Sequence, residues 1–352
     1  MLPDSCASNF LHHCKTQRPR AMPARSAVAF ASFAAMLALA LEPSHAKAQT
    51  PAAYPSKPIR LILPYPPGAG ADSTARTMGE AITEALGQQV VVDSRPGAGA
   101  TVGHALAAKA PPDGYTLLVA TSGGMTYAPA LGMKLSYDPL KDFAPIGLAT
   151  LVPYSLVTFG GLPPNNMREF IAYAKTRPGK LNLGSPGNGT PNHVGGVLLM
   201  KLASIDMVHV PYRGGSPLLT DLIAGQMHIA FISLPSVQPH IATGRLKVLG
   251  VGYTRRLTGA PNVPTIAETV PGFNNTGWRG LVAPAGTPQP IIQKLNAALN
   301  KGLQQPAVVQ LLVNSGLEPA TSTPAGLQEL IAAELQLWRK LIKEAGISAN
   351  VQ

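Results

Sequence analysis

Two glycine-rich loops contain the residues with the clearest chemical potential. The first, PYPPGAGADS at 64–73, places four backbone N–H groups, from Gly68 to Ala71, just ahead of a predicted helix. The second, GSPGNGTPNH at 184–193, again joins a predicted strand to a predicted helix. A helix N-terminus has free N–H groups and a partial positive charge, which together favour an anion. Two such loops on opposite sides of a cleft could hold an anion without a lysine.

Each loop also has a purely structural interpretation. Asp72 could cap the first helix, and Thr190 or Asn192 could cap the second, with Pro191 in the first turn. A dinucleotide-binding motif is incomplete because Ser73 occupies the position of its third glycine, and the GK[ST] ending of a phosphate loop is missing. The loops therefore indicate two helix N-termini that either cap themselves or bind an anion.

Patterns typical of catalysis or of metal binding are weak. Ser185 and Ser122 lack the first glycine of a G-x-S-x-G nucleophile motif. Five histidines follow residue 48, with no H-E-x-x-H pattern and no carboxylate at ligand spacing: His104, His193, His209, His228 and His240. We expect no enzyme activity, no metal and no cofactor.

The composition describes a loop-rich globular protein with a basic balance. Lys+Arg 28 against Asp+Glu 17 gives a net charge of +11, but aromatic residues make up only 5% and no basic stripe is evident, so we expect no nucleic-acid binding. Glycine and proline, 35 of each in 352 residues, stay below the roughly 25–30% typical of low-complexity disorder.

The N-terminal region has the pattern of a secretory signal peptide. Three arginines precede the apolar run Ala27–Leu41, and the Ala46–Ala48 triplet follows it, which predicts cleavage after Ala48, or alternatively after Ala46. This run is shorter than the ~20 residues that span a bilayer. We therefore expect residues 1–48 to be removed and the product to be periplasmic. Both cysteines and three of the net positive charges lie in this leader, which leaves +8.

Alternating elements must position the two loops. Strands are predicted at 59–64, 89–93, 116–121, 146–151, 154–159, 181–185, 207–210, 228–232, 246–251 and 278–283. Helices are predicted at 72–86, 101–110, 167–177, 192–203, 216–224, 290–303, 307–314 and 325–344, so the chain after the last strand is expected to be wholly helical. This alternation predicts parallel, helix-covered sheets, and the length suggests two α/β lobes.

Several motifs in combination resemble the Bug family, the substrate-binding proteins of tripartite tricarboxylate transporters. The resemblance covers about residues 54–347 and includes YPSKPIRLILPYPPGAGAD, VVDSRPGAGATVG, APPDGYTLLVATSG, HVPYRGGSPLLTDLIAGQ and LVAPAGTP. It implies a type II periplasmic-binding-protein fold with a ligand cleft between two lobes. By that analogy, residues 54–153 plus 275–352 form lobe one, and 154–274 form lobe two.

The resemblance also implies a small carboxylate ligand, a monomer, and delivery to a membrane permease driven by an ion gradient. The alternatives are a receptor that presents its ligand to a membrane sensor kinase and, less favoured, a secreted enzyme on this scaffold. The residues expected to bind the ligand are Tyr65, Gly68, Ala69, Gly70, Ala71, Asp72, Ser73, Thr121, Ser122, Thr190, Asn192 and His193, with Ile232 and Ser233 at a position that varies among relatives.

The sequence departs from the family pattern in three places. Ala69 replaces a glycine after Pro-Pro, and Ile232 with Ser233 replaces a polar pair such as Asp-Asn. Because an aspartate there could meet a ligand amine, Ile232 favours an acid without an amine. Arg279 follows Trp278 where smaller or aromatic residues are usual, and nothing in the sequence accounts for it.

Overall fold

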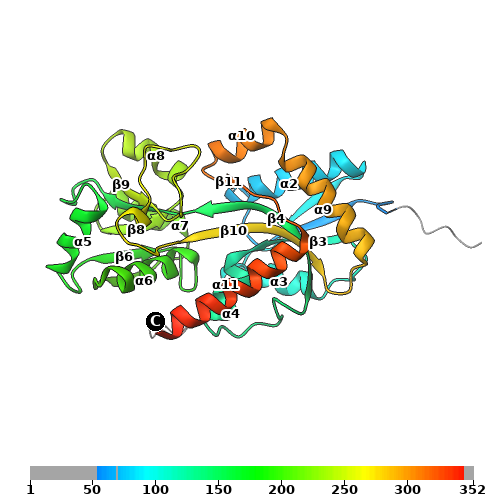
Figure 1. Cartoon of the computed structure of the whole chain (residues 1–352), viewed down its shortest axis with the longest axis horizontal. Helices are drawn as coiled ribbons and strands as arrows, with labels where there is room; N and C mark the ends of the chain where they lie inside the picture. The colour runs from blue at the N-terminus through cyan, green and yellow to red at the C-terminus, as the bar shows by residue number, and fades with distance from the viewer. Residues whose placement is uncertain (1–53, 69, 345–352) are drawn as a thin grey trace, which may run out of the picture. The chain divides into compact units, whose positions relative to one another are not determined.

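The computed structural model describes residues 54–68 and 70–344, which belong to one compact unit of the chain. The predicted signal peptide and Ala69 lie outside the described residues. The described part contains two β-sheets, each covered by helices (Figure 1). None of the described helices is both long enough and apolar enough to span a membrane.

The first sheet has six strands in the order β11-β4-β10-β3-β1-β2. Their bounds are β1 (Ile59–Leu63), β2 (Val90–Ser94), β3 (Thr116–Thr121), β4 (Phe143–Pro153), β10 (Thr276–Pro284) and β11 (Glu318–Pro319). β1 pairs in parallel with β2 and β3, whereas β10 runs antiparallel to β3 and β4. Four of the five residues of β1 (IRLIL) are buried, so this interior strand is covered on both faces.

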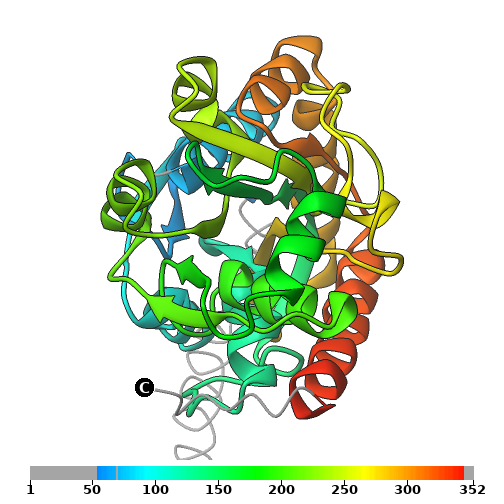
Figure 2. The same ribbon diagram turned by 90° about the vertical axis from the view of Figure 1, so that its left-hand side faces the viewer.

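The second sheet has five strands in the order β7-β6-β8-β5-β9. Figure 2 shows the molecule with this sheet toward the viewer. Their bounds are β5 (Ser155–Phe159), β6 (Asn182–Ser185), β7 (Val208–Pro211), β8 (Ile229–Ile232) and β9 (Leu246–Val251). β6 pairs in parallel with β7 and β8, whereas β5 runs antiparallel to β8 and β9.

Two predictions about the sheets are wrong. The sheets are mixed rather than parallel, because the chain leaves the first sheet along β4, enters the second along β5 and returns along β10. A strand reached from the other sheet need not share the direction of its neighbours. The C-terminal region is not wholly helical either, since β11 pairs Glu318 and Pro319 with Leu151 and Thr150 at the edge of the first sheet.

Helices cover both sheets. Those around the first sheet are α2 (Gly70–Leu86), α3 (Thr101–Ala108), α4 (Ala128–Ala130), α9 (Gln289–Leu303), α10 (Pro306–Asn314) and α11 (Pro324–Glu344), with the short helices η1 (Ala98–Ala100) and η2 (Gly123–Tyr127). Those around the second are α5 (Met167–Lys175), α6 (Pro191–Ala203), α7 (Gly215–Ile223) and α8 (Leu234–Ala242), with η3 (Ile266–Glu268).

Close packing fixes the helix that begins beside the first loop. α2 packs against α9, and a Cβ on Gly302 of α9 would lie 2.2 Å from the Cβ of Ala81. Met78 and Ile82 of α2 are fully buried in the same apolar cluster as Leu61 of β1. α2 is therefore held against the first sheet by a packed interior that leaves little room for adjustment.

Candidate functional site

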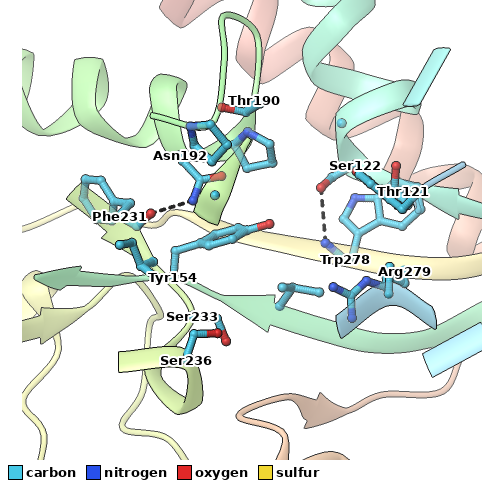
Figure 3. A pocket seen from close by; sticks show the side chains of 18 of the residues that line it. Thr121, Ser122, Tyr154, Thr190, Asn192, Phe231, Ser233, Ser236, Trp278 and Arg279 are labelled. Carbon is cyan, nitrogen blue, oxygen red and sulfur yellow. Dashed lines mark hydrogen bonds between the residues drawn. The ribbon is translucent and has the colours of Figure 1, made fainter. Parts of the chain in front are cut away.

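A cavity of about 340 Å³ lies between the two sheets, at the ends of strands from both (Figure 3). Eight of the predicted site residues line it: Tyr65, Ala71, Thr121, Ser122, Thr190, Asn192, Ile232 and Ser233. In Figure 3, Ser122, Thr121, Trp278 and Arg279 lie on one side, Thr190, Asn192 and Phe231 on the other, and the Tyr154 ring projects between them. The structure thus brings residues from both glycine-rich loops to one cavity.

Other predicted residues lie elsewhere. Gly68, Asp72 and Ser73 line a separate depression together with Arg76. His193 is buried below the second loop and is not part of the cavity wall. Gly70 is the first residue of α2, and Ala69 falls outside the described residues.

The first loop satisfies one of its own backbone donors. α2 begins at Gly70, two residues earlier than expected, so Asp72 lies in the first turn rather than at the N-cap. Its Oδ2 accepts hydrogen bonds from the Gly68 N–H at 3.1 Å and from Arg76 Nε at 3.2 Å. The Gly68 bond and then Arg76 lower the pKa of Asp72. A protein carboxylate therefore occupies the anion-binding position expected at Gly68.

The second loop combines a helix cap with a contact to the neighbouring strand. Thr190 is the N-cap of α6, and its hydroxyl accepts the His193 N–H at 3.4 Å. Asn192 Nδ2 donates to the Phe231 carbonyl at 2.6 Å, which fixes the orientation of the buried amide (Figure 3). Capping and cavity lining, which the sequence left as alternatives, are thus both performed by Thr190.

A pair of histidines supports this loop from below. The rings of His193 and His209 stack with centroids 3.9 Å apart. His193 Nδ1 accepts from the Gly189 N–H at 3.2 Å, and His209 Nε2 lies 2.7 Å from Ser185 Oγ. Burial lowers the pKa of both, and the charge of His193 contributes to lowering that of His209 to about 4. Both rings are therefore neutral at neutral pH, when they support the loop.

A partly buried carboxyl group of α11 supports the opposite wall. Trp278 Nε1 and Thr126 Oγ1 donate to Glu334 Oε2 at 2.8 and 3.0 Å. Thr126 Oγ1 also contacts the Ser122 carbonyl, and Ser122 Oγ accepts from the Trp278 N–H at 3.3 Å. Burial raises the pKa of Glu334 to about 7, against the effect of the two hydrogen bonds. The cavity-lining residues Ser122 and Trp278 are thus tied to α11 through Glu334.

Several cavity residues were not predicted as site residues: Tyr154, Phe231, Ser236, Trp278 and Arg279. Burial, followed by the nearby Tyr65, raises the pKa of Tyr154 to about 12, so its hydroxyl stays protonated. Tyr154 is the single residue between β4 and β5, which is the connection from one sheet to the other. Of these five residues, only Arg279 had drawn attention in the sequence, as an unexplained departure from the family pattern.

Four helices begin at the cavity. Ala71 of α2, Asn192 of α6, Gly215 of α7 and Ser233 at the start of α8 all line it. The positive ends of these helices favour an anion, which at the Gly68 N–H ahead of α2 is already the Asp72 carboxylate. Of the described lining residues, none is acidic and only Arg279 is charged. Across residues 54–68 and 70–344, no cluster of three or more His, Cys, Asp or Glu could hold a metal ion.

Fold and cavity define the class of two-lobed solute-binding proteins with the periplasmic-binding-protein fold. The family profile described as "Tripartite tricarboxylate transporter family receptor" matches residues 74–347, and the chain belongs to this family. The resemblance to the Bug family is confirmed, and members of this kind are binding proteins rather than enzymes.

Two curated bacterial proteins illustrate the relationship. The chain is 39% identical over 316 residues to a UPF0065 protein from the tcbD-tcbE intergenic region of Pseudomonas sp. (strain P51), covering 89% of this chain and 94% of that protein. It is 35% identical over 295 residues to Protein BugT of Bordetella pertussis, covering 83% and 90%.

Two solved structures are similar over most of the chain. Rpa4515 of R. palustris, solved with adipate, has a TM-score of 0.77 at 31% identity, covering 84% of this chain and 99% of that one. MatC (Rpa3494) of Rhodopseudomonas palustris, solved with bound malate, has a TM-score of 0.72 at 32% identity, covering 82% and 100%.

Proposed function

We propose that the protein is a periplasmic receptor that binds a small organic acid without an amine and delivers it to a tripartite tricarboxylate-type permease. The observation that carries this proposal is the cavity wall. Residues at the starts of four helices line it, and Arg279 is the only charged residue among its described members. Such a site stabilises negative charge and disfavours an ammonium group.

The ligand class has two further supports. The two similar structures described above carry the dicarboxylates adipate and malate. Ile232 contributes an apolar side chain where an acidic residue could have received an amine. The cavity volume of about 340 Å³ is at the lower end of the range for small-molecule sites, which suits a compact acid.

We assign the eight predicted residues of the cavity wall, from Tyr65 to Ser233, to ligand contact. Gly68, Asp72, Ser73 and His193 are assigned to structural support of the loops.

The two lobes are proposed as residues 54–153 plus 275–352 for the first and residues 154–274 for the second. The division is supported by the strands, since β4 and β5 belong to different sheets and β10 returns to the first.

Thermal-shift measurements on the purified protein test the ligand class. The panel is adipate, malate, hexanoate and benzoate, with aspartate and glutamate as amine-bearing acids. A ligand at 100 times its Kd stabilises a protein by about 2.7 kcal/mol, so at least one amine-free acid is expected to raise the Tm by several degrees. Stabilisation by aspartate or glutamate alone would contradict the ligand class, and no stabilisation by any acid would contradict the receptor function.

Export and delivery are tested in cells. N-terminal sequencing of the periplasmic protein is expected to begin at Gln49, or at Lys47 if the alternative site is cut. Deletion of the gene should abolish uptake of the acid that binds, and the wild-type gene should restore it. Uptake that continues unchanged in the deletion strain would argue against a transport role.

A further inference from the structure

A guanidinium forms part of the cavity wall. Arg279 of β10 lines the cavity, and its Nη1 donates to Thr74 Oγ1 of α2 at 2.8 Å. It is the only charged side chain among the lining residues that the structure describes. A guanidinium carries five N–H donors in a planar fork that matches a carboxylate, a geometry that an ammonium lacks.

Strand geometry places this side chain. Trp278 packs into the apolar cluster on the α11 side of the first sheet, whereas Leu281 packs into the cluster that contains α2. Since side chains alternate along a strand, Arg279 lies on the α2 side. It is paired with Thr121 of β3, which also lines the cavity. The β10–β4 pairing shifts register just after Arg279, where Ala149 of β4 is the extra residue, and such irregularities are common beside binding sites.

Two tyrosines lie beside Arg279. Burial lowers its pKa, while Tyr154 and Tyr65, which face it from the cavity wall, act in the opposite direction. Charge in a partly buried position is stabilised by an anion in contact with it. The carboxylate of a bound acid would supply such a contact to Arg279 from the cavity side.

The opposite end of the cavity is uncharged. Its polar groups are the hydroxyls of Ser233, Ser236 and Thr190 and the amide of Asn192, at the starts of α8 and α6. Hydroxyl and amide groups both donate and accept hydrogen bonds, so they can bind a carboxylate, an amide or a hydroxyl group. The Arg279 end of the cavity therefore favours a carboxylate, whereas the opposite end can bind either a charged or an uncharged polar group.

We propose that Arg279 is the specificity-determining residue of this site, pairing with one carboxylate of the ligand, while the second-sheet end accepts either a carboxylate or an uncharged polar group. The proposal rests on the proposed function and extends it: one carboxylate is obligatory, at a defined end.

Calorimetric titration of the full chain with adipate, its monoamide and its diamide tests this requirement. Adipate and the monoamide are expected to bind within about fivefold of each other, and the diamide at least 30-fold more weakly. Arg279→Gln should weaken adipate and the monoamide by at least 30-fold and leave the diamide unchanged. A monoamide as weak as the diamide, or Arg279→Gln binding within threefold of wild type, overturns the proposal.

Two further comparisons cover the cases in which adipate does not bind or Arg279→Gln does not fold. If adipate does not bind, the Arg279→Gln comparison is made with whichever of malate, hexanoate or benzoate stabilises the wild type; if none does, the proposed function fails and this proposal with it. If Arg279→Gln does not fold, Arg279→Lys replaces it. Lysine keeps the charge but not the paired hydrogen bonds, so the acid-to-amide affinity ratio is expected to fall about tenfold, and an unchanged ratio overturns the proposal.

Discussion

The indole Nε1 of Trp278 donates a hydrogen bond of 2.8 Å to Glu334, a carboxyl group whose pKa is raised by burial to about 7. The indole lines the cavity and the carboxyl group belongs to α11, so a titratable group stands directly behind the ligand-facing wall. The protonation state of Glu334 therefore bears on the stability of this wall.

Glu334→Gln is expected to flatten the pH dependence of stability between about pH 4.5 and 7. A carboxyl group with a raised folded-state pKa binds its proton more tightly in the folded protein, so its contribution to stability declines as pH rises from about 4.5 to about 7. The shift corresponds to roughly 3 kcal/mol at most. A glutamine oxygen still accepts from Trp278 and Thr126. Tm measurements should show wild type losing stability relative to the variant as pH rises.

Glu329→Gln is the matched control, since Glu329 is exposed on the same helix. Its Tm profile should follow wild type throughout. Parallel profiles for wild type and Glu334→Gln would show that Glu334 does not titrate in this range.

Acid should destabilise the second glycine-rich loop through the stacked histidines. The pKa of His209 is lowered to about 4, so the stability that depends on its neutral form is complete above about pH 6.5 and is lost as pH falls toward 4. His209→Gln is expected to be less stable than wild type at pH 7, with a Tm gap that narrows by pH 4.5. Because buried His104 titrates in the same range, only the difference between the two proteins is diagnostic.

For this experiment His240→Gln serves as control, because His240 lies on α8, away from the stacked pair. A Tm gap between wild type and His209→Gln that stays constant from pH 7 to 4.5 would contradict the prediction.

Asn192→Asp should impair acid binding more than Asn192→Ala. Both variants leave the Phe231 carbonyl without its 2.6 Å donor, which costs about 1–3 kcal/mol of stability for a buried group. Only the aspartate also adds a negative charge to the cavity wall. We expect at least tenfold weaker binding of an organic acid by Asn192→Asp than by Asn192→Ala, measured by calorimetry. Equal affinities would mean that no anionic group of the ligand comes near α6.

Glu318→Ala should destabilise the described unit without removing any cavity residue. The buried Glu318 carboxylate accepts from the Thr258 N–H at 2.8 Å and from Thr258 Oγ1 at 2.9 Å, which ties β11 to the segment after β9. Loss of these charged hydrogen bonds is expected to cost about 1–3 kcal/mol in urea unfolding. Glu329→Ala, with no such tie, should cost less than 0.5 kcal/mol. Equal unfolding midpoints for the two variants would show that the Glu318–Thr258 hydrogen bonds do not stabilise the protein.

Most elements could be predicted from hydrophobic periodicity. β3 (Thr116–Thr121) and β9 (Leu246–Val251) have their predicted bounds, because each is an apolar run with clear boundaries. α8 was missed because it contains two prolines. Pro235 lies in the first turn, where no N–H is needed, and Pro239 lies inside the short helix, so the proline signal that usually ends a helix is misleading here.

The site was less predictable, because its wall depends on strand pairing. The loops at Tyr65 and Thr190 could be found from glycine content and position before a helix. Trp278 and Arg279 could not, since they reach the cavity only because β10 returns from the second sheet to pair with β3 and β4. No local pattern specifies that pairing. The side chain of Asp72 was equally unpredictable, because its bond to the Gly68 N–H depends on α2 starting two residues early.

The single-residue junction at Tyr154 has a mechanical consequence. β4 ends at Pro153 and β5 begins at Ser155, so on this connection any turning of one sheet against the other rotates the peptide units on either side of Tyr154. The ring attached to that pivot forms part of the cavity wall. The residue that connects the two sheets is thus also a residue of the cavity wall, so a change in the angle between the sheets at this connection would move the wall with it.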